Sequence, residues 1–122
     1  MPNKRYMLAR VGVRTLPKDR NSVIESRGDV RADIEAINQG EAIRRGHIYE
    51  VNGRTYGAEP SGVTYPIAGP GIHRLDRGAF KALGVYNTFG RSERAEQILD
   101  AMGIGAEQRA AALAAWLAEH GS

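Results

Sequence analysis

The sequence of 122 residues contains no cysteine. This absence excludes disulfide bonds, thiol catalysis and thiolate metal sites, so any catalysis has to rely on histidine, hydroxyl, arginine or carboxylate groups. The chain also lacks an apolar run near the roughly 20 residues that span a bilayer, and its basic start lacks the apolar stretch of a signal peptide. We therefore expect no membrane contact and a cytoplasmic location, unless the protein is exported by a route that the sequence does not display.

Aromatic side chains are scarce, at 7% of residues, but the hydrophobic share of 42% and the charged share of 25% match globular averages. This composition excludes the class of highly charged, disordered chains. A chain of this length buries enough surface to fold without a disulfide or a metal. Residues 1–122 are predicted to form a single α+β domain, with a small antiparallel sheet, one helix before it and further helices after it.

Positive charge is concentrated at the start of the chain. The net charge is +3, but the first twenty residues carry +5 and leave −2 for the rest. Because arginine offers a planar fork of donors for phosphate, this end predicts a surface that binds RNA or single-stranded DNA. A solvated surface that keeps the protein soluble is the competing interpretation. The basic residues expected to contact nucleic acid are Lys4, Arg5, Arg10 and Arg14.

Two elements are expected in the first half of the chain. Residues 1–16 hold a predicted basic strand, because apolar side chains occupy the odd positions from Met7 to Val13, with the arginines opposite. A loop then leads to a helix over 29–45, with Asp29 as its N-cap and Gly46 as its stop. The helix has a narrow apolar stripe made of Val30, Ile34 and Ile37.

The strongest local signal is Asn52-Gly53 in HIYEV-NG-RTYGA, because this pair suits the positive backbone angles of a type I′ hairpin turn. The turn sets the register of the hairpin, in which Tyr49 faces Tyr56. One face then carries His47, Tyr49, Arg54 and Tyr56. Together with a third strand, the hairpin predicts a β-meander over 47–67.

A loop rich in proline and glycine follows the third strand of the meander. Pro66 donates no backbone hydrogen bond, so this strand ends there or lies at a sheet edge. Gly69-Pro70-Gly71 has two interpretations. It is either a rigid cradle in which backbone N–H groups hold a phosphate, or a tight corner before the next helix.

Three helices are predicted in the second half. A short helix over 76–83 has Asp76 as N-cap and Gly84 as its left-handed stop. An αα-hairpin over 92–119 begins at the cap Ser92. Its second helix offers chiefly alanine, which disfavours the reading of DNA bases and favours close packing against another element.

A candidate catalytic set combines two histidines with arginine. His47 and His73 could act as general base and general acid near neutral pH, while an RNA 2′-hydroxyl attacks its own phosphate. Arg54 or Arg74 would stabilise the developing charge, and Tyr65 precedes the loop that delivers His73. The competing interpretation is that each histidine is a surface or capping residue.

The tyrosines also have two interpretations. Tyr49, Tyr56 and Tyr65 are either a platform on which unpaired bases stack, or the core face of the sheet under the helix at 29–45. No cofactor is expected, and no metal site either, because Asp76 is already used as a cap and no second ligand lies at a suitable spacing.

These patterns favour a small basic, bacterial-type protein that acts on nucleic acid, most concretely a metal-independent ribonuclease of toxin or effector kind. The alternative is a non-catalytic module that binds another protein or a second copy of itself through the αα-hairpin at 92–119. The two hypotheses differ in whether His47 and His73 converge in an open cleft with an arginine.

Overall fold

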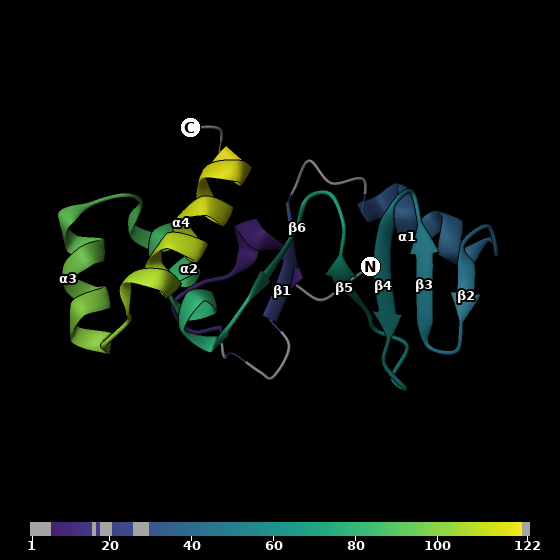
Figure 1. Cartoon of the computed structure of the whole chain (residues 1–122), viewed down its shortest axis with the longest axis horizontal. Helices are drawn as coiled ribbons and strands as arrows, with labels where there is room; N and C mark the ends of the chain where they lie inside the picture. Colours follow the sequence, from purple (N-terminus) through teal and green to yellow (C-terminus); the bar gives the residue numbers. More distant parts are fainter. Residues whose placement is uncertain (1–5, 16, 18–20, 26–29, 121–122) are drawn as a thin grey trace.

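The computed structural model describes residues 6–15, 17, 21–25 and 30–120. These residues form four α-helices and two antiparallel sheets, which confirms the predicted α+β class. Helices α2, α3 and α4 lie at one end of an elongated molecule, and α1 lies with the larger sheet at the other end (Figure 1). The helices are α1 (Val30–Asn38), α2 (Arg77–Phe89), α3 (Glu93–Met102) and α4 (Ala106–His120), preceded by a 3-10 turn, η2 (Leu8–Arg10).

A two-stranded ribbon separates the two ends of the molecule. Strand β1 (Asn21–Ile24) pairs with β6 (Ile72–Leu75) in antiparallel register. Because side chains alternate along a strand, Val23 and Leu75 enter the core under α2–α4, while Ile24 and Ile72 enter the core under α1. The sequence interpretation had assigned both segments to loops and was wrong. Each strand has only four residues. Strand β1 is almost wholly buried, and β6 carries one apolar residue on each face, so neither shows the alternation of a half-buried strand.

The larger sheet has the strand order β2-β3-β4-β5. Its strands are β2 (Ile43–Arg45), β3 (Ile48–Val51), β4 (Arg54–Ala58) and β5 (Thr64–Ala68). The register that pairs Tyr49 with Tyr56 is confirmed, and Asn52 adopts the positive φ of 52° that the turn requires. Pro66 lies in β5, which is an edge strand of this sheet as predicted.

The predicted helix over 29–45 is too long. Helix α1 ends at Asn38, and Gly40 follows in the left-handed region with φ 76°. The chain then forms β2, which turns at Gly46 into β3. Gly40 therefore lies at the end of the helix, ahead of the predicted stop at Gly46. The predicted cap Asp29 lies outside the described residues.

The predicted basic strand is wrong over residues 6–15. This segment contains η2, and its buried side chains are Tyr6, Leu8 and Val11, so burial does not follow the odd positions. Val13, expected to be on the core side, is 51% exposed. The segment docks on α2, where the side-chain amide of Asn87 donates to the carbonyls of Leu8 and Val11 at 2.8 Å each. Residues 1–5 and 16 of the predicted strand lie outside the described residues.

Helix α2 is longer than predicted and passes through Gly84. Its N-cap is confirmed, because the carboxylate of Asp76 accepts a hydrogen bond from the N–H of Ala79 at 2.7 Å. Gly84 does not stop the helix, which continues to Phe89. The backbone of Gly12 lies so close that a Cβ at position 84 would come within 2.4 Å of the Gly12 carbonyl oxygen.

The predicted αα-hairpin is confirmed as two successive helices joined by a short turn. Ser92 caps α3 by accepting from the N–H of Ala95, and Gly103 ends it with φ 71°. Helix α4 packs mainly on α2 rather than on α3, through the fully buried Ala112 and Ala115. The alanines therefore serve close packing. No helix among the described residues is long and apolar enough to cross a bilayer.

Candidate functional site

Arg54, a predicted phosphate-stabilising residue, is committed to a carboxylate inside the protein. It donates from Nε and Nη2 to Asp33 of α1, and its side chain is only 11% exposed. Tyr56, a predicted stacking residue, is fully buried and donates its hydroxyl to the same carboxylate. Asn52 of the hairpin turn adds a hydrogen bond to Asp33 at 2.8 Å. These contacts fasten α1 to the sheet, so Arg54 and Tyr56 have a structural role.

The charge state of this cluster follows from its contacts. Burial by itself would raise the pKa of Asp33, but hydrogen bonds from Arg54, Asn52 and Tyr56 outweigh it and hold that pKa below its ordinary value. Burial raises the pKa of Tyr56, and the hydrogen bond to Asp33 raises it further. At neutral pH the cluster is therefore an ionised carboxylate surrounded by donors.

His73 lies on β6 and contacts a carboxylate that the sequence did not suggest. Its Nε2 is 3.2 Å from Oε2 of Glu25, the residue that follows β1, and both side chains are partly exposed. The neighbouring Arg74 is exposed and projects from the other face of the ribbon, because adjacent residues of a strand alternate. The chain thus gives His73 a carboxylate as neighbour and directs Arg74 away from it.

The two candidate histidines lie on different sheets. His47 is exposed in the turn that joins β2 to β3, whereas His73 belongs to the ribbon. Strands β4 and β5 lie between β3 and β6 (Figure 1). The structure does not bring His47, His73 and Arg54 together in one cleft, and this arrangement gives no support to a paired-imidazole mechanism.

The remaining tyrosines pack within the protein. Tyr65 is buried and lies over Gly57 of β4, where a Cβ would come within 2.3 Å of the tyrosine ring. Its ring centroid is 6.2 Å from that of Tyr6. Tyr49 packs beside the α1 core, and the guanidinium of Arg44 lies 5.7 Å from its ring centroid. Tyr56 and Tyr65 are therefore core residues, as one of the two interpretations predicted. Tyr49 is partly exposed to solvent.

The Gly69-Pro70-Gly71 segment is a corner between β5 and β6. Gly69 has φ 125°, and a Cβ there would come within 2.7 Å of the Gly53 carbonyl oxygen. The carbonyl of Gly71 accepts a hydrogen bond from the N–H of Glu25. The hairpin turn thus packs against one side of Gly69, while Gly69 and Pro70 themselves are exposed.

A basic surface remains at the helical end. Arg10 and Arg14 are exposed, and neither side chain makes a hydrogen bond or ion pair with the described residues. Between them, the backbone of Gly12 crosses α2 at Gly84, one turn after the exposed Lys81. Lys4 and Arg5, the other predicted nucleic-acid contacts, lie outside the described residues.

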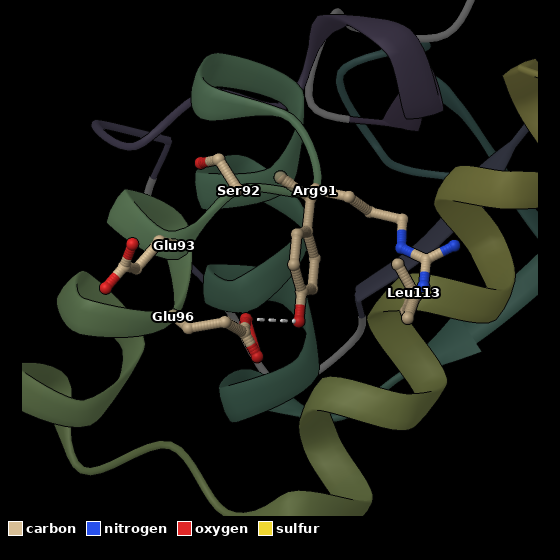
Figure 2. A pocket seen from close by; sticks show the side chains of 6 residues that line it. Arg91, Ser92, Glu93, Glu96 and Leu113 are labelled. Carbon is tan, nitrogen blue, oxygen red and sulfur yellow. Dashed lines mark hydrogen bonds between the residues drawn. The ribbon is translucent and has the colours of Figure 1, made fainter.

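A hollow of about 270 Å³ opens between α3 and α4, with Tyr86 of α2 among its lining residues. Figure 2 shows Arg91 extending toward Leu113 of α4, with Glu96 of α3 across from it. Glu96 accepts a hydrogen bond from the Tyr86 hydroxyl at 3.0 Å. Burial and this contact raise the pKa of Tyr86 to about 12, so the hydroxyl stays protonated at neutral pH. The sequence did not indicate this hollow, because its lining combines residues of α2, α3 and α4 with Arg91 and Ser92 of the connection between α2 and α3.

In the part of the chain that the structure describes, no three His, Asp or Glu side chains are close enough together to hold a metal ion. No protein-family model, curated protein or solved structure matches the chain.

Proposed function

We propose that the protein binds nucleic acid, RNA or single-stranded DNA, through the basic surface formed by Arg10, Arg14 and Lys81. The observation that carries this proposal is the exposure of both arginines with no carboxylate partner among the described residues. Unpaired arginines attract the phosphates of a nucleic acid and release its counterions.

The surface is held in place before any ligand arrives. Arg10 ends η2, and its N–H donates to the carbonyl of Met7 at 2.9 Å. The N–H of Gly12 donates to the hydroxyl of Thr15, so the backbone around Arg14 is also fixed. Because the segment is already ordered, little backbone entropy is lost when phosphates bind.

The proposal is for binding rather than cleavage. His47 lies in the turn between β2 and β3, and His73 lies on the ribbon beside Glu25. A metal-independent ribonuclease needs a base and an acid at one phosphodiester, and this separation does not favour it. We expect RNA recovered from the binding reaction to be intact.

Replacing Arg10 and Arg14 with alanine is expected to weaken RNA binding equally for all sequences. Each lost phosphate contact lowers the slope of log affinity against log salt by about 0.7 for single strands. Fluorescence anisotropy with a labelled oligonucleotide over a salt series measures both the affinity and the slope.

The matched control removes two other exposed arginines, Arg31 of α1 and Arg94 of α3. This variant loses the same charge but is expected to keep its affinity. Equal weakening by both variants would show that net charge alone attracts the ligand. Absence of binding by the parent protein at low salt would remove the proposal.

A second candidate function is a module that binds another protein through the C-terminal helices. The hollow between α3 and α4 favours it, since the apolar Leu113 lies beside the exposed cation Arg91. The Arg91 side of this lining suits a peptide with an apolar side chain next to an acidic one, whereas Glu93 and Glu96 line the hollow on the α3 side.

Peptides selected from a display library against the purified protein are expected to carry that pair of residues. Their affinity should fall at least tenfold in Arg91→Glu, because the acidic residue would then meet a like charge. Glu107→Arg, an exposed change elsewhere on α4, is the control. Selected peptides that bind Arg91→Glu as well as the parent would count against this function.

A further inference from the structure

One face of the four-stranded sheet carries no helix. Helix α1 covers the other face, where Tyr49, Val51 and Tyr56 enter its core. Because side chains alternate along each strand, the residues between them point away from α1. Among the described residues, no helix packs on that side of β2, β3 and β4 (Figure 1). On β2, β3 and β4 the side chains of this open face are Ile43, Arg45, Ile48, Glu50 and Thr55, and Tyr65 of β5 covers Gly57 on the same side.

The open face includes the most exposed large hydrophobic side chain of the described residues. Ile43 is 60% exposed on β2, although an isoleucine is among the residues most often buried. It pairs directly with Glu50, and it borders a hollow of about 410 Å³ that Glu50, Thr55 and the hairpin turn also line. An exposed isoleucine on the edge strand, beside a hollow at the turn end of the hairpin, suits contact with another macromolecule.

The charged side chains on this face are of both signs and have no partner among the described residues. Arg45 pairs in register with Ile48, and Glu50 pairs with Ile43. Ile43 and Ile48 therefore lie diagonally across the strand pair from each other. Arg45 and Glu50 lie on the other diagonal. Neither the Arg45 nor the Glu50 side chain makes a hydrogen bond or ion pair with the described residues.

We propose that this open face binds a second copy of the chain, with the two sheets packed face to face about a twofold axis. In such an interface residue i meets j, and j meets i. Arg45 of each copy can then meet Glu50 of the other, with the isoleucines packed between the two ion pairs. A patch with both charges and an apolar centre is complementary to itself, which a patch of one sign is not.

Pairing of two β2 edges is the other way in which two copies could use this region. Antiparallel pairing within Ile43–Arg45 would centre on Arg44 and place it opposite its own copy. Like charges directly opposite each other destabilise a strand pair. The face-to-face arrangement avoids that repulsion.

The interface is small, because only five side chains of each copy form it, whereas a standard interface buries roughly 800 Å² per partner. We therefore expect a reversible dimer with a dissociation constant in the micromolar range.

Charge reversal tests the interface by sedimentation velocity over a wide range of protein concentration. The parent protein is expected to change from monomer to dimer as its concentration rises. R45E and E50R should each weaken the dimer at least tenfold, because each puts like charges together. The double variant R45E/E50R should restore the dimer, since the pairs are re-formed with their signs exchanged.

Met102→Lys provides a control on α3, at an exposed hydrophobic residue of the other end of the molecule, and should leave the dimer unchanged. Circular dichroism verifies that every variant is folded. A parent protein that stays monomeric at the highest concentration would overturn the proposal. A dimer that E50R leaves intact would also overturn it, because edge pairing of β2 does not use Glu50. A double variant that remains monomeric would exclude the Arg45–Glu50 contact.

Discussion

Asp33→Ala is expected to lower the free energy of unfolding by about 3–5 kcal/mol, the cost of removing one partner of a buried ion pair. The carboxylate is fully buried and accepts hydrogen bonds from Asn52, Arg54 and Tyr56. Without it, the guanidinium of Arg54 remains almost buried with no counter-charge. Urea denaturation followed by circular dichroism measures the change, because α1 and the sheet lose their main polar connection.

Glu35→Ala provides a matched control on the same helix. Glu35 is exposed and lies half a turn from Asp33, so its removal should change stability by no more than about 0.5 kcal/mol. If Asp33→Ala cost as little as Glu35→Ala, the Asp33–Arg54 contact would not contribute to the fold. The variant Asp33→Asn, which keeps the shape of the side chain but not its charge, should fall between the two.

Acid should reveal the same contact. The pKa of Asp33 is lower in the folded state than its ordinary value of 3.8. Its stabilising contribution is therefore complete above that ordinary pKa and is lost as the pH falls through the folded pKa. The stability of Asp33→Asn should depend less steeply on pH in this acidic range. Equal acid sensitivity of parent and variant would contradict the assigned pKa shift.

Features determined by a few adjacent residues could be predicted from the sequence. Asn52-Gly53 set the hairpin register because only a residue pair tolerant of positive φ fits that turn. Asp76 and Ser92 marked two helix starts because their side chains bind the first free N–H groups. Each of these predictions rests on contacts within three or four residues.

Features that depend on distant residues were missed. Strand β1 pairs with β6 across about fifty residues, and neither four-residue strand has a local signal of its own. The partners of Arg54 and His73 are Asp33 and Glu25, which lie far away in the chain. The sequence identified arginine and histidine as candidate site residues, but not the carboxylates that pair with them.

For the segment that carries the basic surface, the sequence predicted the exposure of the arginines correctly and the backbone conformation wrongly. Alternating apolar residues predicted that Arg10 and Arg14 face solvent, and both are exposed. The same alternation predicted a strand, whereas the segment turns at η2 and docks on α2 through Asn87. Exposure of charged residues follows from their cost of burial in either conformation, so it is predictable where the conformation is not.

Gly84→Ala is expected to destabilise the protein by about 2–3 kcal/mol, although helix propensity alone would predict stabilisation of about 1 kcal/mol. The added Cβ would lie 2.4 Å from the carbonyl oxygen of Gly12. That neighbour is backbone and cannot rotate away, so the segment that carries Leu8 and Val11 has to move. Both side chains are essentially fully buried, and Asn87 would lose its two acceptors in the same segment.

The sign of the change in stability shows whether the Gly12 backbone packs closely against Gly84. The sequence had suggested a different role for Gly84, that of a helix stop. Gly78→Ala is the matched control on α2, because a Cβ there meets the side chain of Gln108, which can shift. The control is expected to stay within about 1 kcal/mol of the parent. Thermal unfolding measures both variants. Displacement of the segment should also weaken RNA binding through Arg10 and Arg14, whereas Gly78→Ala should not. If Gly84→Ala proved more stable than the parent, the close crossing of Gly12 over α2 would be wrong.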